Sequence, residues 1–139
     1  MSMTFRYKTV PRPDPFPPDP SPSVPVTLSS GARRVEVVAL LDSGADTTAL
    51  PRGIGDILNL DLDGKREEVG GIRRAEAVTV HIEIGIQKGH ERYSIPAQVK
   101  VILDADVDIP VLLGRKDFFE AFAIEFRERD QRVILRRAL

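Results

Sequence analysis

The chain has 139 residues, of which 42% are apolar and 29% are charged, as in one soluble globular domain with its own core. Its formal net charge of −1 gives no global field that would attract nucleic acid or an anionic membrane, so we expect neither partner. The absence of cysteine excludes disulfides, thiolate metal sites and cysteine-based catalysis.

The first ten residues lack the apolar core of a signal peptide. No window of the sequence approaches the roughly 18 to 20 apolar residues of a membrane-spanning helix. The lack of cysteine also favours a reducing compartment. We therefore expect a soluble, cytoplasmic protein.

A proline-rich segment follows these first ten residues. Residues 11–25 hold eight of the eleven prolines, and proline removes backbone donors and favours extended chain. We therefore predict an extended arm that takes no part in a regular sheet. Residues 4–10 alternate apolar and polar side chains, which predicts a short strand at the end of this arm. On this basis we divide the chain into an N-terminal arm, 1–23, and a domain, 24–139.

From residue 24 onward the apolar residues recur mostly with a period of two, which predicts strands. The strands expected on this basis are 24–28, 35–41, 78–84, 93–103, 111–113, 123–128 and 132–136. We expect a turn over residues 85–91. Short helical stretches are expected after Pro51 and over residues 116–122. The fold class is therefore all-β with one or two short helices.

The segment ALLDSGADTTALP, residues 39–51, contains the strongest candidate for chemistry. Asp42 comes directly after Leu40 and Leu41, at the end of a buried-strand pattern. Removing a charged side chain from water at that position costs free energy, so its presence indicates a function. Ser43 and Gly44 then form a turn, which fixes the carboxylate at the end of a rigid strand.

One carboxylate does little acid–base work, whereas two that share a proton act as base and acid together. Like charges about 3 Å apart cannot both ionise, so the two pKa values of such a pair separate. Asp46 is no natural opposite partner for Asp42, because Gly44 and Ala45 turn the chain between them. A twofold axis that brings the Asp42 of a second copy against the first is the economical solution, so we expect a homodimer.

The segment ALLDSGADTTAL resembles the active-site segment of the retropepsin-like aspartic proteases. IPVLLGR, residues 109–115, resembles the apolar-apolar-Gly-Arg segment before that family's C-terminal helix, and VGGI, residues 69–72, resembles the tip of its flap hairpin. The resemblance covers about residues 24–128. It implies a single-domain, closed β-barrel-like fold and a homodimeric aspartic endopeptidase that acts on polypeptides without a metal or other cofactor.

The resemblance also implies roles for the matching residues. Asp42 is the catalytic aspartate, given once by each subunit, and Ser43 hydrogen-bonds across the dimer axis. Leu113 and Gly114 brace the Asp42 loop from behind. The residues expected to contact substrate, through main-chain groups, pocket walls or the flap tip, are Gly44, Asp46, Ala49, Gly70, Gly71, Ile72 and Leu112.

Asp46 is also expected to form an ion pair with Arg115, because a planar guanidinium suits a partly buried carboxylate. The Gly70-Gly71 pair gives the hinge that a moving flap requires. The flap is about four residues shorter than in the retroviral enzymes. Those enzymes build their dimer from short terminal strands, whereas here a proline arm precedes the domain and a long hairpin closes it, which indicates a different interface.

Two alternatives stay open at this point. The same dimer could be a catalytically weak or inactive module that binds peptides or serves dimerisation. The chain could also be a structural domain whose proline arm, residues 1–23, recruits a partner.

Overall fold

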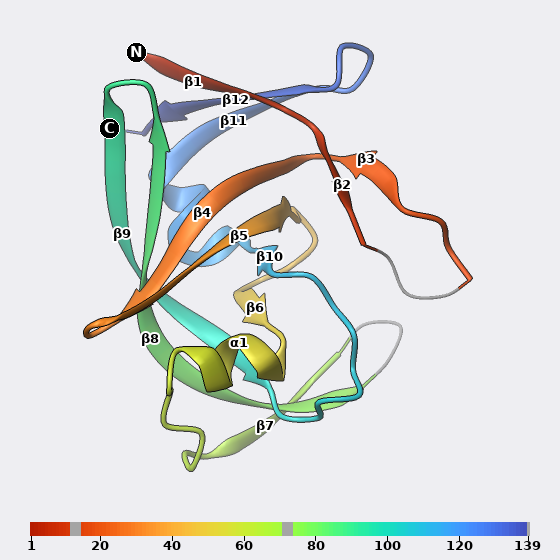
Figure 1. Ribbon diagram of the computed structural model, residues 1–139, viewed down its shortest axis with the longest axis vertical. Coiled ribbons are helices and arrows are strands. Elements are labelled where there is room, and N and C mark those ends of the chain that lie inside the picture. The colour runs from red at the N-terminus through yellow and green to blue at the C-terminus, as the bar shows by residue number, and fades with distance from the viewer. Residues whose placement is uncertain (12–14, 71–73, 139) are drawn as a thin grey trace.

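The computed structural model describes residues 1–11, 15–70 and 74–138, and strands make up most of it (Figure 1). The strands are β1 (Ser2–Arg6), β2 (Lys8–Val10), β3 (Asp19–Ser21), β4 (Ser23–Ser30), β5 (Arg33–Leu41), β6 (Thr48–Leu50), β7 (Arg66–Val69), β8 (Ala75–Lys88), β9 (Glu91–Ile102), β10 (Leu112–Leu113), β11 (Phe122–Arg127) and β12 (Arg132–Arg137). The two short helices are α1 (Arg52–Ile57) and the π-helical turn η1 (Arg115–Phe119). The expected all-β class with two short helices is confirmed.

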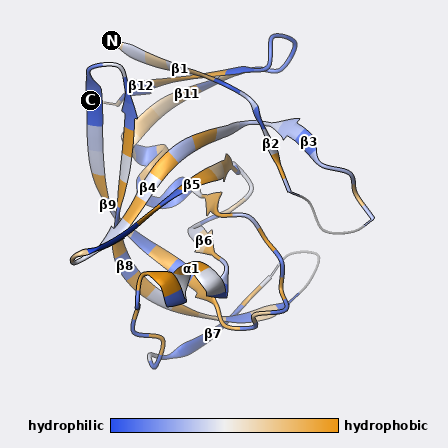
Figure 2. Cartoon of the chain, viewed as in Figure 1, coloured by the Kyte–Doolittle hydropathy of each residue, from blue (hydrophilic) through white to orange (hydrophobic). Residues whose placement is uncertain are grey.

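Six of the strands form a closed barrel. The strand order is β4-β5-β10-β6-β9-β8, and β8 pairs in turn with β4. The closing contact between β4 and β8 covers three residue pairs, from Thr27 with Gly85 to Ser29 with Glu83. Residues alternate along the strands, and Leu28, Ile84 and Val99 are fully buried inside. Figure 2 shows this alternation of hydrophobic and hydrophilic residues along β8 and β9.

The turn expected over residues 85–91 is wrong in its extent. Strand β8 continues to Lys88, and the turn consists of Gly89 and His90 only, because Lys88 pairs directly with Glu91. Gly85 lies inside the strand, where it pairs with β9 on one side and with Thr27 of β4 on the other. Glycine at position 85 therefore marks a close approach of neighbouring strands rather than a turn.

The N-terminal residues are part of a second sheet. Strand β1 pairs antiparallel with β12, which pairs with β11 (Figure 1). Met3 and Phe5 belong to the same buried cluster as Val133 and Leu135. The strand predicted over residues 4–10 is present as two strands, β1 and β2, which are separated at Tyr7, and Phe5 and Tyr7 pack on the core. The boundary between arm and domain at residue 24 stays a prediction.

The proline-rich segment is less irregular than expected. Strand β3 pairs with β2, and β4 begins at Ser23, so the prediction that residues 11–25 lie outside any regular sheet is wrong at the C-terminal end of that segment. Proline is tolerated on strands with an unpaired edge. Pro20 lies in a two-stranded sheet, and Pro25 lies before the pairing of β4 with β8, which begins at Thr27.

Helix α1 begins directly after Pro51, as predicted. Gly55 allows this helix to pack closely on β9, since a β-carbon at position 55 would lie 2.8 Å from Cγ1 of Val101. Of the helices in the described part of the chain, none is long and apolar enough to cross a membrane.

Candidate active site

Asp42 directly follows strand β5, and neighbouring segments hold this strand end on both sides. On one side Leu40 N–H donates to the Val111 carbonyl at 2.9 Å, and Asp42 N–H donates to the Leu113 carbonyl at 3.0 Å. On the other side Leu41 N–H donates to the Pro22 carbonyl at 2.9 Å. The main chain that carries the Asp42 side chain is therefore part of the sheet rather than of a free loop.

The turn after β5 orients the Asp42 carboxylate. Gly44 N–H donates to Oδ1 of Asp42 at 2.9 Å, and Ala45 N–H donates to the Asp42 carbonyl at 3.1 Å. A β-carbon on Gly44 would lie 3.2 Å from that carboxylate oxygen, so glycine suits this turn. Asp42 is half-buried, whereas Ser43 and Gly44 are exposed. Among the described residues no hydrogen bond reaches Oδ2 of Asp42.

Gly114 lies directly behind this turn. A β-carbon at position 114 would lie 2.5 Å from the carbonyl carbon of Thr47 and 2.7 Å from its oxygen. Gly114 N–H donates to Oγ1 of Thr48 at 3.0 Å, and Thr48 is fully buried. Sequence reasoning missed Thr48. Its available signal was a hydroxyl at the start of a short strand, β6, directly before the apolar Ala49 and Leu50.

Asp46 and Arg115 form the expected ion pair. The expectation of a partly buried carboxylate is wrong, because the Asp46 side chain is 85% exposed and that of Arg115 is 59% exposed. Exposed pairs contribute only about 0–1 kcal/mol. Two main-chain bonds of 2.9 Å hold the loop more firmly: Arg115 N–H donates to the Ala45 carbonyl, and Lys116 N–H donates to the Asp46 carbonyl.

Leu112 and Ala49 lie side by side near the Asp42 loop. Leu112 pairs with Leu40 of β5 on one side and with Ala49 of β6 on the other. These three apolar residues are partly exposed and form a row across three strands, whereas Leu113, the next residue of β10, is fully buried. The structure thus brings together two of the expected pocket residues, whose contact with substrate stays a prediction.

The residues expected to form a flap lie on the hairpin of β7 and β8 and beyond it, and their role as a flap stays a prediction. Val69 pairs with Ala75 at its outer end, and Gly70 is exposed. Gly71 and Ile72, which the sequence assigns to the flap tip and a pocket wall, lie outside the described residues.

Asp117 is a second residue that sequence reasoning missed. Its backbone has φ 68° and ψ −60°, a conformation rare for a residue other than glycine. Its Oδ2 accepts from Gln98 N–H at 2.8 Å, and its own N–H donates to Oε1 of Glu120 at 2.7 Å. The bond from Gln98 joins η1, which directly follows Gly114, to strand β9, and the bond to Glu120 is local to the end of η1. An isolated aspartate before two phenylalanines gave no signal of this contact.

Two surface hollows, of about 420 and 450 Å³, are lined mainly by residues of β4, β8 and β9, and Asp42 lines neither. The described residues include no group of three or more His, Cys, Asp or Glu side chains that could hold a metal ion.

No family model matches this sequence, and no curated protein matches it. The chain is similar in structure to a retropepsin-like aspartic protease from Rickettsia conorii, with a TM-score of 0.66 and 19% identity over 97% of this chain and 98% of that one. It is also similar to EIAV protease in complex with the inhibitor HBY-793, with a TM-score of 0.48 and 21% identity over 68% of this chain and 82% of that one. The first likeness confirms the retropepsin-like fold that the sequence predicts.

Proposed function

We propose that this chain is an aspartic endopeptidase that works as a homodimer with one Asp42 from each subunit. The observation that carries the proposal is the Asp42 carboxylate itself. It stands at the end of a strand that is hydrogen-bonded on both sides, with Oδ1 oriented by Gly44 N–H and Oδ2 without a hydrogen-bond partner among the described residues. The retropepsin-like fold of the chain supports the same assignment.

The chemistry follows from a second carboxylate about 3 Å away, because two such groups share one proton at moderate pH. The ionised Asp42 takes a proton from a water molecule, which attacks the peptide carbonyl. The protonated Asp42 of the other subunit donates its proton to the carbonyl oxygen. A tetrahedral diol forms. Its collapse breaks the C–N bond as the Asp42 that took the proton from water gives it to the leaving nitrogen, while the other Asp42 takes a proton from a diol hydroxyl, so the pair again holds one proton. The mechanism needs no covalent intermediate and no metal.

A polypeptide substrate would bind extended, because main-chain groups then supply most of its hydrogen bonds. We assign its contacts to the Gly44 carbonyl and the Asp46 main chain beneath it and to the β7–β8 hairpin, with Gly70 and Gly71, above it. Leu112 and Ala49, which lie side by side, would form apolar walls, and Ile72 is assigned a similar role. Ser43, exposed beside Asp42, would hydrogen-bond across the twofold axis.

Incubation with a diverse peptide library, followed by mass spectrometry, tests this function. We expect cleavage by the wild-type protein and none by the Asp42→Asn variant, whose melting temperature and circular dichroism should match the wild type. Asp130→Asn, in the β11–β12 turn, is the matched control for loss of one carboxylate and should cleave normally. Peptide binding without cleavage by the wild-type protein would favour the peptide-binding module instead.

The pH dependence gives a second test. Because the carboxylate pair must hold one proton, cleavage should be fastest on the acidic side of neutral and fall as that proton is lost. A flat rate up to pH 9 would contradict a shared-proton mechanism.

A further inference from the structure

We infer that Ser23 is a positioning residue for the Asp42 carboxylate, because its buried hydroxyl ties strands β2 and β3 to the strand that carries Asp42. The inference rests on the proposed function, since that function gives Asp42 its role. It adds a residue outside the Asp42 turn that controls the rate of cleavage without touching the substrate.

Buried hydroxyl groups flank the strand that ends at Asp42. Only two polar side chains are fully buried in the described part of the chain, those of Ser23 and Thr48. Thr48 acts from the β10 side of β5, where its Oγ1 accepts from Gly114 N–H at 3.0 Å. Ser23 lies in β4, on the opposite side of β5, and pairs in register with Leu40. A buried polar group costs free energy unless it is hydrogen-bonded, and a satisfied one favours a single geometry.

The Ser23 hydroxyl makes one hydrogen bond to each strand of the β2–β3 hairpin. Its Oγ donates to the Ser21 carbonyl at 2.9 Å, and the same oxygen accepts from Lys8 N–H at 3.1 Å. The hydroxyl is therefore used both as donor and as acceptor. Lys8 and Ser21 also pair with each other in register. Strands β2, β3 and β4 thus meet at one buried oxygen atom.

Pro22, between Ser21 and Ser23, connects this oxygen to the strand that carries Asp42. The Pro22 carbonyl accepts from Leu41 N–H at 2.9 Å, and Leu41 is the residue directly before Asp42. The Ser23 hydroxyl holds both neighbours of Pro22, and the proline ring fixes φ of Pro22 itself. The Pro22 carbonyl therefore has little freedom to turn away from Leu41. Loss of the Ser23 hydroxyl should weaken this hydrogen bond and displace Asp42.

The donor that binds the Ser23 oxygen is itself fixed to the second sheet. Tyr7, directly before Lys8, is buried, and its N–H donates to the Gln131 carbonyl at 2.9 Å. The Tyr7 hydroxyl donates to Oε1 of Glu128 at 3.2 Å. Both acceptors belong to the turn between β11 and β12. The Ser23 hydroxyl thus joins two separately anchored parts of the fold next to Asp42.

The rate of cleavage should depend strongly on this arrangement. Displacement of a catalytic group by about 1 Å can lower a rate about a hundredfold. The two Asp42 carboxylates must lie about 3 Å apart to share a proton, which leaves little tolerance for movement. The residues to which we assign substrate contacts, such as Gly44 and Leu112, do not touch Ser23 by any hydrogen bond of the described chain. We therefore expect an effect on kcat rather than on KM.

Ser23→Ala removes the hydroxyl without changing the backbone chemistry. We expect kcat per dimer to fall at least about tenfold, while KM stays within about twofold of the wild-type value. Sedimentation gives the concentration of dimer to which kcat is referred. Amide hydrogen exchange, followed by NMR, should be at least about tenfold faster at Leu41 and unchanged at Leu28, in the middle of β4.

A second variant guards against misfolding of Ser23→Ala. Ser23→Cys fills the same space with a thiol, which is a weak donor and a weak acceptor, so kcat should fall and Leu41 exchange should rise as in the alanine variant. Ser30→Ala is the matched control. Ser30 is half-buried at the other end of β4, where it pairs with Arg33. Its kcat and its exchange rate at Leu41 should equal those of the wild type.

The failures of the two proposals can be told apart. A wild-type dimer that cleaves peptides, with kcat and Leu41 exchange unchanged in both Ser23 variants, would overturn the role of Ser23 alone. Faster Leu41 exchange with unchanged kcat per dimer would make the hydroxyl purely structural and overturn that role as well. A fall in kcat that Ser30→Ala reproduces would do the same. A wild-type chain that is inactive at all concentrations would overturn the proposed function.

Discussion

Gly114 lies so close to Thr47 that a β-carbon at position 114 would be 2.5 Å from the carbonyl carbon of Thr47. Backbone atoms cannot move aside as the end of a side chain can, so Gly114→Ala must displace the turn that holds Asp42. We expect a loss of about 1–3 kcal/mol in the free energy of unfolding, the range for overpacking a filled site. Urea denaturation measures this loss, and kcat should fall with it because the carboxylate shifts.

Gly53→Ala is the control for glycine replacement. A β-carbon on Gly53 would meet no atom within 4 Å, and the residue lies inside α1. Alanine there should leave stability unchanged or raise it by about 0.5–1 kcal/mol. Equal losses at both positions would show that the close contact at Gly114 has no special effect.

Thr48→Val tests the buried hydrogen bond between Gly114 and Thr48 of β6. The variant keeps the shape of the side chain but removes Oγ1, the acceptor for Gly114 N–H at 3.0 Å. A buried donor without a partner costs about 1–3 kcal/mol, so unfolding should become easier by that amount. Thr48→Ser keeps the hydroxyl and should lose less. If serine and valine variants unfold at the same urea concentration, the hydrogen bond is unimportant.

Asp117→Ala tests the junction of η1 with β9. The substitution removes the acceptor of Gln98 N–H, which we expect to cost about 1–3 kcal/mol. Alanine also tolerates the positive φ at this position poorly. Asp117→Asn keeps an oxygen acceptor and tolerates positive φ better, so it should be closer to the wild type in urea denaturation. An asparagine variant as unstable as the alanine variant would contradict this explanation.

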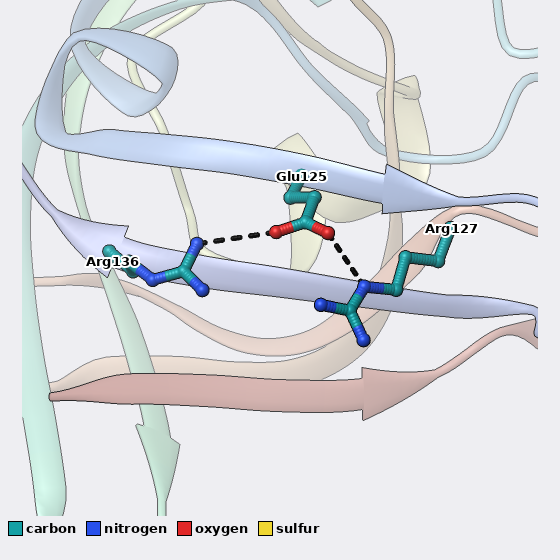
Figure 3. Close-up of polar contacts among 3 residues, drawn as sticks. All are labelled: Glu125, Arg127 and Arg136. Carbon is teal, nitrogen blue, oxygen red and sulfur yellow. Dashed lines mark hydrogen bonds and ion pairs between the residues drawn. The ribbon is translucent and has the colours of Figure 1, made fainter.

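Glu125 gives a pH-dependent prediction (Figure 3). The hydrogen bond from Arg127, at 2.6 Å, holds the pKa of Glu125 below its ordinary value, and Arg136 acts in the same direction. A carboxylate with a lowered pKa stabilises the fold above its unfolded-state pKa, and this stability is lost as pH falls through the folded-state pKa. Glu125→Gln should therefore lower the melting temperature at pH 7. The difference in melting temperature between this variant and the wild type should vanish as the pH falls below the folded-state pKa of Glu125.

Glu36→Gln, an exposed position on β5, controls for the loss of one negative charge. Its melting temperature should follow that of the wild type across the same pH range. A difference between wild type and Glu125→Gln that persists unchanged at pH 2 would rule out the ion pairs as its cause.

Much of the fold was predictable because the spacing of apolar residues along a short segment indicates whether that segment forms a strand or a helix. Alternating apolar residues indicated the hairpins of β4 with β5 and of β11 with β12, and Pro51 marked the start of α1. Long-range pairing was not predictable. The alternation in β1 indicates a strand but not its pairing with β12, and glycine at position 85 reads as a turn unless Thr27 is known to lie beside it.

The candidate site was also predictable only where local sequence determines it. Asp42 stands out because a charge directly after a buried strand is unusual, and the order of Asp, Ser and Gly indicates the turn. The groups that hold the turn come from far along the chain, as with Thr48, Gly114 and the carbonyl of Leu113. Partial burial of Asp46 was expected because a guanidinium, that of Arg115, is its partner. The Asp46 side chain is instead exposed to solvent, which no local sequence pattern reveals.

Mixing the wild-type protein with its Asp42→Asn variant tests the central claim most directly. The two chains are combined at equal concentration and allowed to exchange subunits. Peptide cleavage is then measured per total amount of chain, with wild-type and variant chains counted together. If both Asp42 carboxylates of a dimer are needed, random exchange leaves about one quarter of the activity of an all-wild-type sample. Activity that stays at about one half, in proportion to the wild-type chains, would show that each chain acts alone.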